Sequence, residues 1–192
     1  MTTYPVRIRR WTRKEYQRLA ELEIIRHDEP LELIGGQLIV AEPKGRPHAT
    51  AVELTAEVLR AAFGPGWAVR AQNPMALDDE SEPEPDVIVV PGTLRDYLDA
   101  HPSSAALVVE VSETTLAFDR RHKASLYARA GVADYWIVNL VDRRLEVHRR
   151  PVADASAEFG WAYADVTALP LHSSVSPLAR PDVVVFVSDL FP

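Results

Sequence analysis

The chain has 192 residues, of which 47% are apolar, 21 are basic and 28 are acidic, giving a formal net charge of −7. This size fits one α/β domain, and the acidic balance argues against a protein that coats nucleic acid through bulk charge, although a local basic patch can still bind it. The chain has no cysteine, which excludes disulfides, thiolate metal sites and cysteine nucleophiles.

The first half of the chain alternates helical periodicity with short apolar runs. In chain order it predicts a helix over 11–23, a hairpin over 30–43, a helix over 48–63 and a strand over 67–78 that breaks at Pro74. Thr12 is a possible cap of the first helix, and the Gly35-Gly36 pair marks the hairpin turn. No apolar run reaches membrane-spanning length and the start MTTYPVRIRRW lacks a signal-peptide core, so we expect a cytoplasmic protein without a membrane partner.

The second half predicts a strand over 86–91, a short helix over 93–100, a strand over 105–112, a helix over 117–132 and strands over 134–140 and 144–150. A tail rich in Pro, Ser and Ala follows from 151 and ends in a strand over 182–191. We therefore expect one α/β domain over 1–192, with a core over 10–150 and a C-terminal extension over 151–192. Its mixed sheet should be antiparallel in its central part and flanked by helices.

Two acids stand where apolar β-strands are expected. Asp86 opens the run DVIVV, and Glu110 lies inside ALVVEVSE; a buried charge is costly unless it is paired. If strands 86–91 and 105–112 pair antiparallel, the two carboxylates meet at one edge of the sheet, whereas parallel pairing separates them. Oxygen donors without Cys or a His pair favour Mg²⁺ or Mn²⁺ over Zn²⁺.

A cationic group is expected beside such a metal site. Ser112 shares a strand face with Glu110 but carries no charge. Lys123 follows Glu110 by thirteen residues, in the next predicted helix, and its long side chain can fold back over the strand end. An ammonium there can orient a water or stabilise charge that develops on a phosphate.

Each of these residues also has a purely structural interpretation. Asp86 after a proline is a common turn former, and Glu110 can be a core acid paired with an arginine. Asp119 and Lys123 stand four residues apart, as in a surface ion pair on a helix.

Other polar and aromatic residues have structural interpretations too. Without metal-ligand spacing, we expect five histidines to face solvent: His48, His101, His122, His148 and His172. Tyr135 and Trp136 pack the sheet or form a dimer contact. Arginine pairs are solvated surface or grip phosphates.

Four segments together carry a resemblance to a known family: LELIGGQLIV, PEPDVIVV, LVVEVSETT and DRRHKASLYARAGVADYWIV. They resemble the Uma-two family, which is assigned to the PD-(D/E)XK restriction-endonuclease-like fold. The resemblance runs from about residue 10 to about 150, with a weaker echo at VSDLF. It implies that Asp86 and Glu110 are the motif acids, that Ser112 occupies the usual lysine position and that Lys123 is the displaced lysine. Two further positions of the family are matched by Glu32, as a possible extra ligand, and by His48, without an assigned role.

The resemblance implies a restriction-endonuclease-like fold and Mg²⁺- or Mn²⁺-dependent hydrolysis of phosphodiester bonds, with DNA as the expected substrate. Asp86, Glu110 and the backbone carbonyl of Val111 would hold the ion, and in-line attack would leave a 5′-phosphate. Arg120 and Arg121 would clamp phosphates, and the protein would form a homodimer. The alternative is a decayed nuclease fold that acts as a nucleic-acid-binding or dimeric interaction protein, which the charge of −7 and the serine at the lysine position favour.

Overall fold

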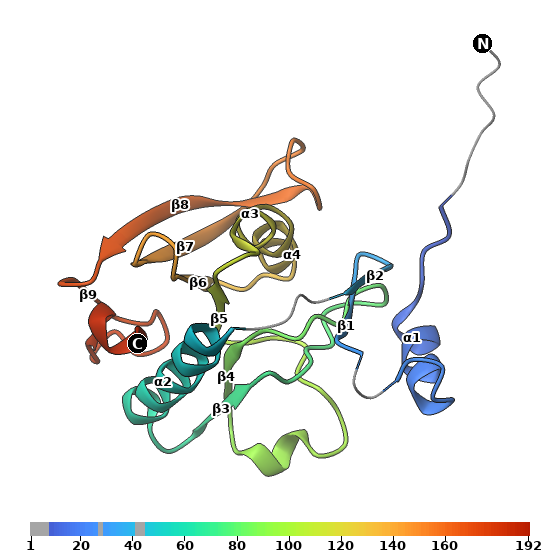
Figure 1. The fold of residues 1–192 in the computed structure, drawn as a ribbon, viewed down its shortest axis with the longest axis horizontal. Helices are drawn as coiled ribbons and strands as arrows, with labels where there is room; N and C mark the ends of the chain where they lie inside the picture. The colour runs from blue at the N-terminus through green and yellow to red at the C-terminus, as the bar shows by residue number, and fades with distance from the viewer. Residues whose placement is uncertain (1–7, 27–28, 41–44) are drawn as a thin grey trace.

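The computed structural model describes residues 8–26, 29–40 and 45–192 (Figure 1). The helical elements are α1 (Arg13–Glu21), α2 (Arg46–Phe63), η1 (Leu94–Tyr97), α3 (Leu116–Phe118), the π-helical turn η2 (Asp119–Lys123), α4 (Ala124–Arg129) and η3 (Val187–Leu190). The strands are β1 (Leu31–Ile34), β2 (Gln37–Val40), β3 (Trp67–Ala71), β4 (Val87–Pro91), β5 (Leu107–Ser112), β6 (Asp134–Asn139), β7 (Arg144–Ala153), β8 (Trp161–Pro170), β9 (Ser174–Val175) and β10 (Val185–Phe186). None of the described helices has the length and apolar character needed to cross a bilayer.

A six-stranded mixed sheet in the order β3-β4-β5-β6-β7-β8 forms the centre of the fold. Neighbouring strands run antiparallel except β5 and β6, which are parallel. A parallel pair needs a crossover, and residues 113–133 supply one that contains α3, η2 and α4. The predicted α/β class with a mixed sheet is confirmed. The sheet is mainly antiparallel, but the parallel pair β5–β6 lies at its centre, where antiparallel pairing was predicted.

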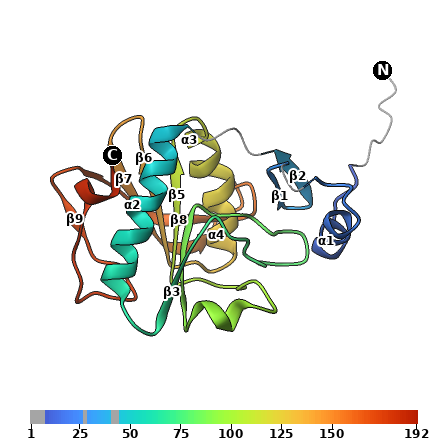
Figure 2. The same cartoon turned by 60° about the horizontal axis from the view of Figure 1, so that its bottom comes forward.

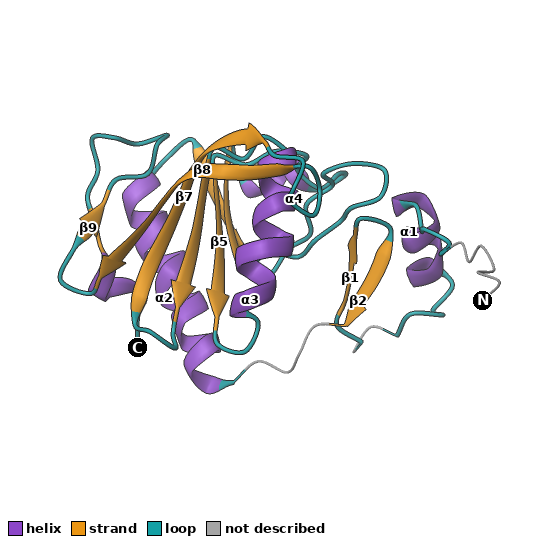
Figure 3. Cartoon of the chain, turned by 90° about the horizontal axis from the view of Figure 1, so that it is seen from above, coloured by secondary structure: helices purple, strands orange, loops and turns teal. Residues whose placement is uncertain are grey.

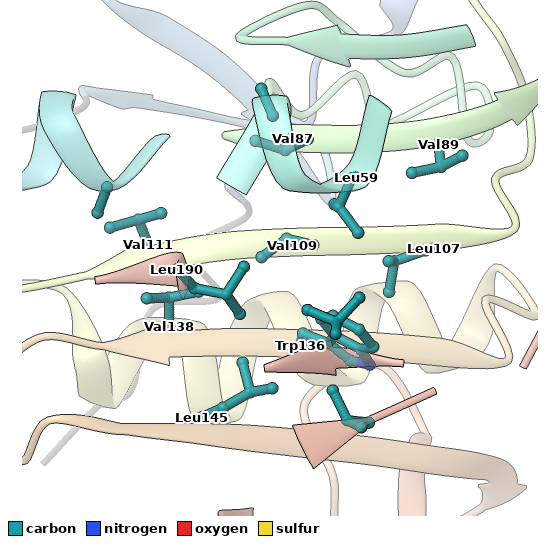
Figure 4. Packing of buried hydrophobic residues seen from close by; sticks show 14 of the residues in the cluster. Leu59, Val87, Val89, Leu107, Val109, Val111, Trp136, Val138, Leu145 and Leu190 are labelled. Atoms are coloured by element: carbon teal, nitrogen blue, oxygen red, sulfur yellow. The ribbon is translucent and has the colours of Figure 1, made fainter. Parts of the chain in front are cut away.

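Helices cover the sheet on both faces, with α2 on one and α3, η2 and α4 on the other (Figure 2). Alternate side chains of β5 point to opposite faces of the sheet. Val109 packs on the face covered by α2, here called the α2 layer (Figure 4), and Val108 packs on the face covered by α4, the α4 layer. On β6, Trp136 packs in the α2 layer and Tyr135 in the α4 layer, and both are fully buried. Of the two predicted alternatives, these aromatics therefore pack the sheet, and their burial within the fold leaves neither exposed for a dimer contact.

The N-terminal helix and hairpin stand to one side of the sheet (Figure 3). Thr12 caps α1 in a capping box, as predicted. The turn between β1 and β2 has positive φ at Gly35 and Gly36, a conformation that glycine adopts at little cost; the end of the predicted hairpin, 41–43, lies outside the described residues. Leu33 and Glu82 exchange backbone hydrogen bonds, which tie the hairpin to the segment before β4.

The chain beyond residue 150 departs from the predicted extension with a single final strand. Strand β7 continues to Ala153, and β8 adds a ten-residue edge strand to the main sheet. The strand predicted over 182–191 is wrong, because only Val185–Phe186 is extended in a β-bridge pair and the turn η3 follows. Leu190 of that turn (Figure 4) packs in the α2 layer together with Val187, so this segment completes the core of that layer.

Candidate active site

A pocket of about 230 Å³ opens where β4 begins and β5 ends. Strands β4 and β5 are antiparallel, with Val87 opposite Val109, so Asp86 and Glu110 lie at the same edge of the sheet. The described lining residues include six carboxylates and one lysine: Glu32, Glu84, Asp86, Glu110, Glu113, Asp119 and Lys123. The pocket is therefore strongly acidic around one ammonium group.

Asp86 is buried and held in one orientation. Its Oδ2 atom accepts a hydrogen bond from the Val111 backbone N–H at 2.9 Å and lies 3.2 Å from His48 Nε2. Val111 lies beyond the last β4–β5 pair, so its backbone meets the side chain of Asp86 in place of a strand neighbour. His48 comes from the first turn of α2 and is only 7% exposed, so the expectation that it faces solvent is wrong.

Glu110 and Lys123 form a buried ion pair that also involves the N-terminal hairpin. Lys123 Nζ lies 3.0 Å from Glu110 Oε1 and 3.3 Å from Glu32 Oε2. Tyr127, one turn further along the helix, donates its hydroxyl hydrogen to Glu110 Oε1 at 2.7 Å. Glu110 is therefore paired with a lysine, and the structural interpretation that it pairs with an arginine is wrong.

The turn η2 places Lys123 in the pocket. A π-helical turn inserts a residue into an α-helix and is frequent at functional sites. Here it leaves Asp119 2% and Lys123 7% exposed, and both line the pocket. Thr115 donates a hydrogen bond to Asp119 Oδ2 at 2.7 Å. The interpretation of Asp119 and Lys123 as a surface ion pair is therefore wrong.

Burial and crowding of charge perturb the acids. Desolvation raises the pKa of Glu110 to about 8, against the attraction of Lys123. Burial also raises the pKa of Asp119. Burial alone would lower the pKa of Lys123, but the carboxylates of Glu110 and Glu32 outweigh it and hold that pKa well above its ordinary value. At neutral pH the ammonium is charged, and a bound cation would displace the proton that the raised pKa lets Glu110 hold.

The donor types fit Mg²⁺ or Mn²⁺, because carboxylates and a backbone carbonyl are hard oxygen ligands. Glu32 adds a buried carboxylate whose Oε2 atom, 3.3 Å from Lys123 Nζ, has no other polar contact among the described residues. Within 8–26, 29–40 and 45–192, however, no three His, Asp or Glu side chains already converge on a common metal position. The acids are instead arranged around Lys123, so the donor set fits the ion in its chemistry but is not arranged as a coordination site.

The two arginines predicted to clamp phosphates lie outside this pocket. Arg120 is engaged in a bidentate contact with Glu146, at 2.8 and 2.5 Å. Arg121 is exposed and forms no ion pair among the described residues. Of the two, only Arg121 has its guanidinium available for a phosphate.

Three neighbours of Asp86, Glu110 and Lys123 were not predicted: His48 and Asp119, which line the pocket, and Tyr127, which donates to Glu110. Tyr127 and Asp119 lie one helical turn on either side of Lys123, and this i, i+4 spacing was the available signal. His148 was also expected to face solvent, but it is buried. No signal in the sequence marked His148, because its burial comes from rings on the two strands that flank β7 in the sheet.

Comparisons with known proteins agree with this fold. The family model of Uma2, described as "Putative restriction endonuclease", matches residues 13–188. No curated protein matches the chain in sequence. A crystal structure of a putative nuclease belonging to DUF820 from Anabaena variabilis is similar, with a TM-score of 0.66 and 13% sequence identity. The similarity covers 90% of this chain and 96% of that chain, and at this identity it shows a common fold.

Proposed function

The chain belongs to the Uma2 family of putative restriction endonucleases, and from that premise we propose that it is a metal-dependent nuclease that hydrolyses phosphodiester bonds of DNA. The observation that carries the proposal is the convergence of Asp86, Glu110 and Lys123 in one pocket at the edge of the sheet. Asp86 directly precedes β4, Glu110 lies in β5 and Lys123 ends η2.

The ion would be held by Asp86, Glu110 and the backbone carbonyl of Val111, with Glu32 as a further oxygen donor. When bound, Mg²⁺ or Mn²⁺ lowers the pKa of a coordinated water and neutralises charge on the phosphate. The acidity of the pocket supports a need for such an ion. A phosphate anion would be repelled by the surrounding carboxylates unless a divalent cation entered with it.

The remaining residues would position and stabilise the reacting groups. Lys123 would release Glu110 to the ion and direct its ammonium at the attacking water or at the charge that develops on the phosphate. His48 would hold the Asp86 carboxylate in the orientation seen here. The buried hydroxyl of Tyr127 would hold the Glu110 carboxylate in its orientation through their hydrogen bond.

A second candidate function rests on the same ion pair. Lys123 already acts as an internal counter-ion for Glu110 and Glu32, as expected of a decayed nuclease that only binds nucleic acid. Such a protein would bind DNA with or without a metal and would not cleave it. The homodimer stays a prediction under both functions.

The test is incubation of the full chain with supercoiled and single-stranded DNA, in Mn²⁺, in Mg²⁺ or in EDTA. We expect nicking or cutting that depends on the ion and is lost in Asp86→Asn and Glu110→Gln. Glu57→Gln, which removes one charge from the exposed face of α2, is the matched control and should cleave as wild type. Equal cleavage by wild type and both site variants would identify a contaminant and refute the proposal.

A further inference from the structure

A second pocket, of about 520 Å³, shares the turn η2 with the acidic pocket. Asp119 and Lys123 of the turn line the acidic pocket, whereas the three residues between them line the second one. Its principal lining residues are Arg120, Arg121, His122, His148, Glu158 and Trp161. An α-helix with its side chains is about 10–12 Å across, so one strand of nucleic acid laid over this turn would reach both pockets.

His148 supplies a buried polar atom that has no partner. The residue is 5% exposed, and its ring packs against those of Tyr135 and Tyr163, with centroids 5.3 and 5.8 Å away. Its Nε2 atom is buried and has no hydrogen-bond partner among the described residues. Such an atom costs free energy unless something satisfies it. Because His148 lines the pocket, a ligand with a hydrogen-bonding edge can be that partner.

The remaining lining combines an aromatic ring with positive charge. Trp161, at the start of β8, keeps 37% of its side chain exposed although it borders the pocket. Arg121 is exposed without an ion pair among the described residues. The single described acid in the lining, Glu158, lies 3.8 Å from His122. An exposed indole and an exposed guanidinium in the lining of one pocket are the combination that proteins use to stack bases and hold the attached phosphate.

We propose that this second pocket binds a nucleobase of the substrate strand, stacked on Trp161, with its edge hydrogen-bonded to His148 and its phosphate held by Arg121. The ligand class is a nucleotide whose base is unpaired, in a single strand or extruded from a duplex. The inference rests on the proposed function for the identity of the polymer. It goes beyond that function in assigning a base-binding site separate from the acidic pocket.

Calorimetric titration of the full chain in EDTA tests this site without any cleavage. The probes are deoxyadenosine monophosphate, thymidine monophosphate and, as a ligand without a base, deoxyribose 5-phosphate. We expect the nucleotides to bind about tenfold tighter than deoxyribose 5-phosphate, and Trp161→Ala to remove that advantage, as is typical of base stacking. Arg121→Ala should weaken all three probes, whereas Arg60→Ala, on the exposed surface of α2, should leave them unchanged.

A short single-stranded oligonucleotide and the same strand with one abasic residue separate a strand-bound base from a free nucleotide. Preference for the intact strand, lost in Trp161→Ala, supports a base of the substrate strand. If mononucleotides bind but the two strands bind equally, the site takes free nucleotides, and our assignment to the substrate strand is wrong. Equal binding of nucleotides and deoxyribose 5-phosphate refutes the base pocket outright. Loss of cleavage with normal nucleotide binding would refute only the nuclease proposal, so the two failures are distinguishable.

Discussion

Replacing Glu110 by glutamine should make the metal-free protein more stable at neutral pH. Burial raises the pKa of Glu110 from 4.5 to about 8 in the folded state, so the folded protein holds a proton that the unfolded chain has released. Wild-type stability therefore falls as pH rises from 4.5 towards 8, by about 1.4 kcal/mol per pH unit. At pH 7 this linkage amounts to about 3 kcal/mol.

Glutamine resembles the protonated acid in shape and keeps an oxygen that can accept the hydrogen bond from Tyr127. Its amide does not titrate, and Lys123 keeps Glu32 as a partner. Urea unfolding of both proteins in EDTA, at several pH values between 4.5 and 8, measures the difference. We expect the two proteins to have similar stability at the acidic end and Glu110→Gln to be more stable by about 3 kcal/mol near pH 7.

The control is Glu57→Gln, which should stay within about 0.5 kcal/mol of wild type because Glu57 is on the surface. If Glu110 and Lys123 are instead a fully ionised structural pair, the stability change caused by Glu110→Gln has the opposite sign. Glu110→Gln would then weaken a buried pair and destabilise the protein by about 3–5 kcal/mol across the whole pH range. A less stable variant, or a difference that does not change with pH, would refute the reasoning.

Three other variants test the remaining parts of the pocket. Lys123→Met removes the ammonium from among the carboxylates and should cost about 3–5 kcal/mol at neutral pH, partly recovered in acid as the carboxylates take up protons; unchanged urea unfolding at pH 7 would contradict this. Mn²⁺ or Mg²⁺ at a hundred times its dissociation constant should stabilise wild type by about 2.7 kcal/mol and leave Asp86→Asn unaffected in thermal melts; no stabilisation of wild type by either ion would count against metal dependence. His48→Phe should lower cleavage about 10- to 100-fold, because it removes the group that orients Asp86, whereas His172→Phe on the surface should have no effect; equal activity of both variants would show that His48 has no positioning role.

Sequence reasoning located the acids because their chemistry conflicts with their surroundings. Asp86 and Glu110 interrupt apolar runs, and antiparallel pairing of their strands brings them to one edge, as the structure shows. The reach of Lys123 followed from the length of its side chain and its place in the next helix. Both inferences depended on three consecutive predicted elements, the strands over 86–91 and 105–112 and the helix over 117–132. Their hydrophobic periodicity and their order along the chain were enough to place the three side chains.

The parts that could not be predicted depend on contacts between distant segments. Glu32 reaches Lys123 only because Leu33 pairs with Glu82, and no local pattern specifies that pairing. Strand β8 was missed because most of its side chains are exposed, so it lacks the apolar alternation that marks a half-buried strand. His148 was misjudged because its burial comes from rings on β6 and β8.

The π-helical turn makes the site sensitive to chain length at one place. Successive residues of an α-helix are about 100° apart around its axis. Deleting a single residue within 119–123 would relax the turn to a regular helix and rotate its two ends relative to each other. Either the Asp119 side chain would leave the acidic pocket or the Tyr127 hydroxyl would lose its hydrogen bond to Glu110. This would happen even if the deleted residue were one of the two arginines and no residue type were lost from the turn. Relatives of this chain should therefore rarely have a gap within 119–123.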